Sequence, residues 1–401
     1  MSKGFYCIPN GTDEIINIGS KMGLEHALVN NYLEDKEGNI WISTYGKGVF
    51  CLNNLYLKSF SEEDGLSSNS VNSIMKAASN TLLIGTFHGL NILENKTFIP
   101  VKIKNATSLT EYIYGVEKYE NDVYICGSFG LKEIAHSDYN QLKFHFINYA
   151  SFCKTSRGIF LIGTGVNTVI VSDELNAKKP NLSILSLFGD SVSINRVNKI
   201  VEDSEKNIWV GSAFGLFKLT SPNGGDGKTG WEKTFFTDNP ILDAKINAIH
   251  LDKENNVWFA GEKGIATYDL KDDSMHSFTS INGYDLSSST SIASDAVNRI
   301  WIGNMKGLFM LDNNSVTKLN SRTGLPSDEV LSLHFDADKN MLYVGTNAGI
   351  SFLDITKFDR YHPTAPQVKI THLKAGDSVY TNFDKLVFKP NMNDISINFR
   401  G

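Results

Sequence analysis

The chain has 401 residues, of which 41% are hydrophobic and 11% aromatic, so it can bury a sizeable core and is not a disordered polypeptide. Its 38 Lys and Arg residues against 44 Asp and Glu residues give a net charge of −6, and no basic cluster offers a footprint for DNA or RNA. No apolar run approaches the roughly 20 residues of a membrane span, and residues 1–20 contain no apolar stretch of signal-peptide length.

One pattern recurs between residues 41 and 350. Its eight positions are an aromatic residue or Leu; a β-branched residue; a small residue; Gly, Thr or Ser; two variable residues; Gly; and an apolar residue. The copies begin, in chain order, at Trp41, Leu83, Tyr124, Leu161, Trp209, Trp258, Trp301 and Tyr343. Their mean spacing is about 43 residues, which is typical of a repeat architecture.

Each copy predicts four short strands. About eleven residues before the anchor lies an apolar segment such as 197–200, and a turn with Asp and Asn four residues apart, such as Asp203 and Asn207, precedes the anchor strand. Asp and Asn suit such a turn because their side chains bond nearby backbone amides. A third strand such as 308–311 and a fourth such as 316–319 follow, and no helical periodicity competes with them.

Four strands in a period of about 43 residues predict an all-β fold, a β-propeller of four-stranded blades. Eight anchors allow eight blades, or seven if one copy belongs to an upstream propeller. The glycine before each third strand predicts a positive φ in a tight connection. The glycine inside each anchor strand predicts a close approach by a neighbouring element.

The four cysteines are Cys7, Cys51, Cys126 and Cys153, and none of them has the spacing of a metal site. Cys7 and Cys51 occupy the same place in successive repeats, and equivalent positions of neighbouring units usually lie too far apart for a disulfide. We therefore expect all four to be buried free thiols.

These motifs resemble the two-component regulator propeller repeat. Residues 64–74, DGLSSNSVNSI, resemble the first half of that repeat, residues 34–42, EDKEGNIWI, resemble the second half, and residues 324–330, GLPSDEV, resemble a further opening segment. The resemblance extends from residue 3 to about residue 359. It implies the extracytoplasmic, periplasmic sensor region of a hybrid two-component system, whose membrane contact is made through segments outside this chain.

A Pro-rich break at residues 362–366 predicts a domain boundary. Strands are expected at 367–370, 386–388 and 393–399. This region resembles the opening of the immunoglobulin-like, three-tyrosine domain, a β-sandwich, that follows such propellers. The expected domains are thus a propeller over residues 1–361, beginning inside a blade, and a truncated domain over residues 362–401. On this reading the chain is a fragment of a longer sensor.

No catalytic motif rises above background: GxSxG, HExxH, a Walker motif and an EF-hand loop are all missing from the sequence. No pair among the nine histidines has metal-ligand spacing, and the Asp/Asn turns are too poor in carboxylates for calcium. We expect neither a cofactor nor a metal, and we interpret the Asp/Asn turns as hairpin caps.

The variable residues of the anchor loops are the candidate ligand-binding residues. Loops with a uniform backbone and varied side chains can form a rigid binding platform, and aromatic rings with interspersed cations suit a polar or sugar-like ligand. Arg196, just before an inner strand, is expected to point toward the central channel. The full candidate set is Tyr45, Lys47, Phe87, His88, Phe129, Arg196, Phe214, Lys263 and Lys306. The recurring Asn30, Asn72, Asn198 and Asn247 are expected to make structural hydrogen bonds instead.

The resemblance implies a non-enzymatic sensor that detects a small molecule or oligosaccharide, shifts a dimeric arrangement and relays the signal to a histidine kinase. A DNA-binding output without a kinase is an alternative. A propeller-fold lyase or glycosidase is the second hypothesis, and it requires converging groups such as His88, Tyr45 and Arg196. A protein-binding platform is the third.

Overall fold

The structure is a computed structural model, and it describes residues 5–8, 15–17, 27–35, 39–52, 56–101, 112–119, 122–135, 138–146, 149–165, 168–172, 182–186, 196–220, 230–313, 315–361, 369–376, 378–381 and 394–400. The chain divides into two compact units. One unit is Tyr56–Asp359, and the other comprises Met1–Leu55 and Arg360–Gly401.

Within the described part of Tyr56–Asp359, seven four-stranded antiparallel sheets form the blades of a propeller. The first four blades are β7 (Val71–Ala78), β8 (Thr81–Thr86), β9 (Gly89–Glu94) and β10 (Thr97–Val101); β11 (Ile113–Tyr119), β12 (Asp122–Gly127), β13 (Gly130–Ala135) and β14 (Asp138–Phe146); β15 (Tyr149–Lys154), β16 (Phe160–Thr164), β17 (Thr168–Ser172) and β18 (Leu182–Ser186); β19 (Val197–Glu202), β20 (Ile208–Ser212), β21 (Gly215–Thr220) and β22 (Glu232–Phe235). The last three are β23 (Ile246–Leu251), β24 (Val257–Gly261), β25 (Ile265–Asp269) and β26 (Ser274–Phe278); β29 (Ser289–Ser294), β30 (Ile300–Asn304), β31 (Gly307–Asp312) and β32 (Ser315–Leu319); β33 (Val330–Asp336), β34 (Met341–Thr346), β35 (Gly349–Asp354) and β6 (Leu57–Phe60).

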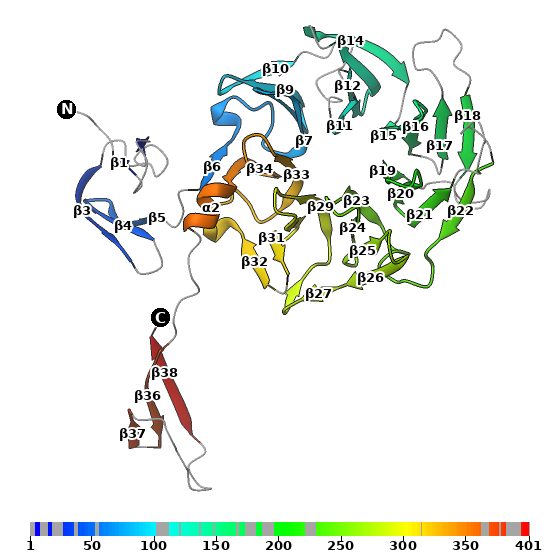
Figure 1. Ribbon diagram of the computed structural model, residues 1–401. Coiled ribbons are helices and arrows are strands. Elements are labelled where there is room, and N and C mark those ends of the chain that lie inside the picture. The colour runs from blue at the N-terminus through cyan, green and yellow to red at the C-terminus, as the bar shows by residue number, and fades with distance from the viewer. Residues whose placement is uncertain are drawn as a thin grey trace. The chain divides into compact units, whose positions relative to one another are not determined.

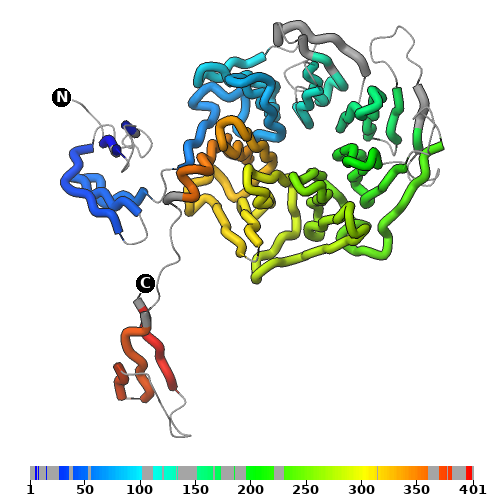
Figure 2. Tube along the Cα trace, in the orientation of Figure 1, coloured from blue at the N-terminus to red at the C-terminus, as the bar shows by residue number. Residues whose placement is uncertain are grey.

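The ring closes because the first strand of this unit completes the seventh blade. β6 pairs with β35, in the register Phe60 to Ile350, although nearly 300 residues of chain separate them. The inner strands β7, β11, β15, β19, β23, β29 and β33 contact one another in succession, and β33 returns to β7 (Figures 1 and 2). Of the two blade numbers that the sequence allows, the closed ring has seven.

The two kinds of glycine behave as predicted. A Cβ on Gly345 of the anchor strand β34 would lie 2.7 Å from both Val71 Cγ1 and the Val71 carbonyl oxygen, so the glycine lets the first blade approach the seventh. Gly307, the first residue of β31, has φ of 143°, in the region that glycine tolerates and other residues avoid.

Four connecting elements complete the unit: the 3₁₀ turns η1 (Glu62–Asp64) and η2 (Ser321–Thr323), and the hairpin of β27 (Ser280–Ile281) and β28 (Tyr284–Asp285). The helix α2 (Ile355–Tyr361) follows the last blade.

The other unit contains further strands. The Trp41 copy forms the three-stranded sheet of β3 (Leu28–Glu34), β4 (Ile40–Tyr45) and β5 (Gly48–Leu52), and β1 (Tyr6–Cys7) pairs with β2 (Ile16–Asn17). β36 (Lys369–Ala375) pairs with both β37 (Ser378–Tyr380) and β38 (Ile395–Arg400), in agreement with two of the three strands expected after residue 362. The third expected strand, 386–388, lies outside the described residues.

The cysteines follow the prediction in part. Cys126 and Cys153 are buried free thiols, and burial raises the pKa of Cys126 to about 12 and of Cys153 to about 11. The expectation that Cys51 is buried is wrong: it is a free but exposed thiol, because its sheet has only three strands around a small core. The side chain of Cys7 lies outside the described residues.

Candidate functional site

The central channel begins at a bulge that every inner strand of the ring shares. Each inner strand skips one partner near its start, for example between Val197 and Lys199. The extra residue in such a bulge is left out of the ladder, so its side chain is free to take another direction. Asn198 Nδ2 donates to the Ile246 carbonyl oxygen at 2.8 Å, and Asn247 Nδ2 donates to the Ser289 carbonyl oxygen at 2.8 Å.

These bonds tie neighbouring inner strands together and confirm the structural role predicted for Asn198 and Asn247. Asn72 differs: its Oδ1 accepts from Ser70 Oγ at 3.4 Å, but its Nδ2 is buried without a hydrogen-bond partner among the described residues. Asn30 belongs to β3 in the other unit.

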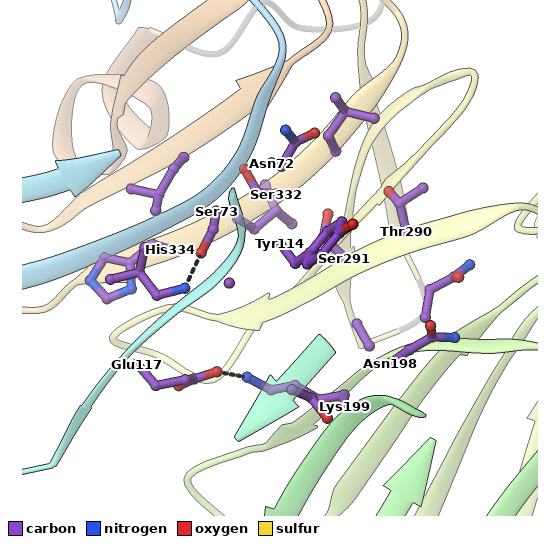
Figure 3. Close-up of a pocket in the computed structure, with 18 of the residues that line it drawn as sticks. Asn72, Ser73, Tyr114, Glu117, Asn198, Lys199, Thr290, Ser291, Ser332 and His334 are labelled. Atoms are coloured by element: carbon purple, nitrogen blue, oxygen red, sulfur yellow. Dashed lines mark hydrogen bonds and ion pairs between the residues drawn. The ribbon is translucent and has the colours of Figure 1, made fainter. Parts of the chain in front are cut away.

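Inside the channel lies a cavity of about 280 Å³ lined by inner-strand residues (Figure 3). It contains an ion pair between Lys199 of β19 and Glu117 of β11, strands that belong to the fourth and second blades. Burial alone disfavours the charge of Lys199, but attraction and hydrogen bonding by Glu117 outweigh it and raise the lysine pKa. Lys199 therefore stays charged, and its ion pair with Glu117 bridges the fourth and second blades.

Two histidines line the same cavity at equivalent strand positions. His250 lies opposite Trp258, and His334 lies opposite Tyr343. Burial lowers the pKa of each imidazole to about 4, so both are neutral at physiological pH. His250 Nε2 lies 2.8 Å from Ser294 Oγ, and His334 Nε2 accepts the Lys76 backbone N–H at 3.3 Å.

At the end of the channel where the inner strands begin, four side chains contact one another in succession. The Phe87 and Tyr112 rings meet edge to face with centroids 5.1 Å apart, and the Tyr112 and Tyr114 rings are tilted with centroids 4.7 Å apart. The guanidinium carbon of Arg196 lies 4.2 Å from the Tyr114 ring centroid. Because Tyr114 and Arg196 come from the second and fourth blades, this aromatic cluster spans the channel mouth.

The anchor loops lie at this same end, since each anchor strand runs antiparallel to its inner strand. The Phe87 N–H donates to the Ser70 carbonyl oxygen at 3.0 Å, and the Ala213 N–H donates to that of Arg196 at 2.9 Å. We call this surface the anchor-loop face. Phe87 is 48% exposed on it and contacts His88 edge to face, with ring centroids 4.9 Å apart.

The remaining predicted residues of the ring divide by their contacts. Phe129 folds back on the packing between the first two blades, where its ring would lie 2.6 Å from a Cβ on Gly127. Phe214 is 53% exposed, and Lys263 is exposed. Lys306 pairs with Asp285 at 2.5 Å, and its hydrogen bond lowers the pKa of Asp285 to about 2.

Tyr45 and Lys47 belong to the other unit, in β4 and the connection that follows it. The structure thus brings Phe87, His88 and Arg196 into one cluster. It leaves Phe214, Lys263 and Lys306 on separate loops of the same face.

Sequence reasoning missed the centre of this cluster, Tyr112 and Tyr114. A signal was present, because Tyr114 takes the same bulge position in β11 that Asn198 takes in β19. The side chain at that position lines the channel. Burial raises the pKa of Tyr112, and Arg196 opposes that rise, so the phenol stays protonated and can donate a hydrogen bond.

The cluster supplies ring faces, a guanidinium and hydroxyl groups, which is a binding chemistry. Among the residues that the structure describes, no group of three His, Cys, Asp or Glu side chains is placed to hold a metal ion. In the same part of the chain, no helix is long and apolar enough to cross a membrane.

Comparison with known proteins confirms the predicted repeat family. The model of the family described as "Two component regulator propeller" matches residues 23–46 and 191–214. Histidine kinase P4 of Formosa agariphila is 23% identical over an alignment of 360 residues that covers 85% of this chain and 23% of that protein. The chain thus spans about a quarter of the length of this curated relative.

Solved structures share the fold. The extracellular domain of the hybrid two-component system BT3049 from B. thetaiotaomicron superposes with a TM-score of 0.68 at 19% identity, over 93% of this chain and 50% of that one. The extracellular domain of BT4673 from the same organism gives 0.63 at 19% identity, over 94% and 54%. A streptogramin B lyase gives 0.56 at 11% identity, over 74% and 97%.

Proposed function

Since the chain contains two-component regulator propeller repeats, we propose that it is the ligand-sensing propeller of a two-component sensor, located outside the cytoplasm. Two observations support the proposal. The repeat model matches at two separate positions, and the fold is shared with extracellular domains of two-component systems. In this role the propeller binds and does not catalyse.

The binding site in this proposal is the anchor-loop face around Tyr114. The observation that supports it best is the aromatic cluster from Phe87 to Arg196, which places the exposed ring of Phe87 and the half-buried rings of Tyr112 and Tyr114 near a cation at a channel mouth. Aromatic rings pack against the C–H faces of a sugar, and a guanidinium donates to its hydroxyl or carboxylate oxygens. A glycan-derived oligosaccharide is therefore the proposed ligand.

The contact between Tyr114 and Arg196 also supplies a route for a signal. Arg196 belongs to the fourth blade and Tyr114 to the second, so a ligand that inserts between them changes how two blades are held together. For signalling, the ligand must bind one arrangement of the sensor better than the other. The proposed relay passes through a homodimer to a histidine kinase elsewhere in the parent protein.

Calorimetric titration of the whole chain with a panel of plant and algal oligosaccharides tests this function. We expect one of them to bind, and Tyr114→Ala to weaken that binding at least tenfold with an unchanged circular dichroism spectrum. Phe235→Ala is the matched control, because Phe235 is an exposed aromatic residue (43%) on the outer strand β22, away from the channel.

The outcomes separate the alternatives. Equal affinity of the wild type and Tyr114→Ala would exclude the anchor-loop face. A panel without any binder would contradict the oligosaccharide sensor, and turnover of a bound oligosaccharide would establish an enzyme.

A further inference from the structure

A second cavity lies between the fifth and sixth blades, lined by none of the residues that form the channel mouth. Its volume is about 580 Å³, within the range of roughly 300–1,000 Å³ that small-molecule sites occupy. Residues of the β23–β24 turn, the β29–β30 turn and the end of β26 line it, among them Trp258, Phe278 and Val297. We call it the Trp258 groove.

The groove exists because the covering of one tryptophan is missing. Trp209 and Trp301, at the equivalent position of other blades, are completely buried. Trp209 contacts Phe259 and Tyr268 of the next blade, with ring centroids 5.1 and 5.0 Å away.

Around Trp258, smaller side chains stand at the corresponding positions. Leu311 of the sixth blade takes the position that Tyr268 takes in the fifth, because Leu311 pairs with Ile300 as Tyr268 pairs with Val257. A leucine thus stands beside Trp258 where a tyrosine covers Trp209. Trp258 is accordingly only partly buried, and its ring has no aromatic contact among the described residues. Its Nε1–H is already bonded to Asp252 Oδ2 at 2.9 Å, so the indole offers the groove its ring surface alone.

A small hairpin between the two blades forms another wall. β27 and β28 pair over two residues each, through an Asn282-Gly283 turn in which both residues have positive φ (51° and 80°). The Leu286 N–H closes its base on the Thr279 carbonyl oxygen at 2.9 Å, and Tyr284 packs edge to face on Phe309. The hairpin is thus fixed, and it places Ile281 and Asn282 in the lining.

The polar rim favours an uncharged ligand that donates hydrogen bonds. Arg299, the one cation among the described residues of the lining, is occupied by Asp295 at 2.6 Å and Asp359 at 2.5 Å. The carboxylate of Glu254 makes no hydrogen bond or ion pair with the described residues, and Asp312 adds a second available carboxylate. The third carboxylate of the lining, Asp252, is already bonded to Asn256 and Trp258. Two carboxylates without an available cation repel an anion and accept bonds from hydroxyl groups.

We infer that the Trp258 groove binds a neutral saccharide unit, which stacks on the indole of Trp258 and donates hydroxyl hydrogen bonds to Glu254 and Asp312. Flat aromatic surface for the ring of a sugar and acceptors for its edge are both present, in a cavity of sufficient volume. This inference is independent of the proposed site on the anchor-loop face.

Tryptophan fluorescence of the whole chain tests it, with cellobiose, maltose, laminaribiose and diacetylchitobiose as neutral probes. Digalacturonic acid and glucosamine serve as the anionic and cationic counterparts. We expect at least one neutral disaccharide to change the emission in a saturable way below 20 mM, and Trp258→Phe to abolish the change. The buried Trp209 and Trp301 are shielded from such a probe.

A second variant, which blocks the groove, keeps the test valid if Trp258→Phe does not fold correctly. Val297 is 71% exposed on the groove, so Val297→Arg fills the groove without disturbing the core and is expected to weaken binding at least tenfold. Its matched control is Ile99→Arg, an exposed residue (45%) of β10, which should bind as the wild type does.

Three results would overturn the inference: no response to any neutral disaccharide, a response that survives both Trp258→Phe and Val297→Arg, or tighter binding of either charged probe. Tyr114→Ala should leave the response unchanged. Failure of this site is therefore distinguishable from failure of the anchor-loop face.

Discussion

The Asp203 carboxylate should be one of the most sensitive single positions of the ring. Asp203 is 2% exposed, and its oxygens accept from the Asn207 N–H (2.9 Å), the Asn207 side-chain amide (3.0 Å) and Trp209 Nε1 (2.8 Å). Asp203→Ala removes the acceptor of three donors in residues that are at most 7% exposed. At about 1–3 kcal/mol for each buried donor left without a partner, and with some relaxation, the free energy of unfolding should fall by about 3–5 kcal/mol.

Urea unfolding followed by circular dichroism measures this loss. Asp203→Asn is the control, since it keeps one acceptor oxygen in the same place and should lose less than half as much. In a double-mutant cycle, Trp209→Phe removes the indole donor, so Asp203→Ala should cost about 1–2 kcal/mol less in that background. A loss below about 1 kcal/mol for Asp203→Ala in the wild-type background would refute this assignment of the turn as a structural clamp.

Further predictions concern the channel and the ring closure. Glu117→Leu and Lys199→Met should each destabilise the chain by about 1–2 kcal/mol, because each leaves a partly buried charge without its partner. The double variant should recover most of the loss, and additive losses would contradict the ion pair. The pKa values of His250 and His334 are about 4 in the folded state and about 6.5 in the unfolded chain. Their contribution to the free energy of unfolding is therefore complete above pH 6.5 and is lost as the pH falls toward 4. Each histidine should account for up to about 3 kcal/mol of this loss, which urea unfolding midpoints between pH 7.5 and pH 4 would measure. The pH dependence should be smaller in His250→Gln and His334→Gln, and a stability that does not change with pH would contradict the burial of the two imidazoles. Gly345→Ala should lower the free energy of unfolding by about 2–3 kcal/mol, because its Cβ would push the seventh blade away from the first. Gly115→Ala, with open space around its Cβ, should lower it by less than about 1 kcal/mol, and equal losses would contradict the close approach at Gly345.

The repeat made the architecture predictable. A period of about 43 residues, the alternation of short apolar segments and the glycine positions were enough to place the strands of the blades, because each depends on local residue types. Closure by seven blades depends on a contact between β6 and β35 that no local pattern encodes. The sequence alone therefore left seven and eight blades equally open.

The candidate site was predictable only where a position repeats. Anchor-loop residues such as Phe87 were found because the loop recurs, and Asn198 was assigned a structural role because it recurs. Tyr114 occupies a recurring position with a residue found there only once, so the pattern concealed it. The hydrogen bond from the anchor tryptophan to the turn aspartate, as from Trp209 to Asp203, was not predicted. It joins the turn and the anchor strand, two motifs that were interpreted separately.

Deuterium exchange of the whole chain, with and without a saturating concentration of the oligosaccharide found by titration, is the decisive test of ligand binding at the anchor-loop face. We expect slower exchange at that face, in the segments around Phe87, 112–119 and 196–202, with outer strands such as β22 unchanged. Protection confined to segments outside the anchor-loop face and the channel would contradict binding at that face.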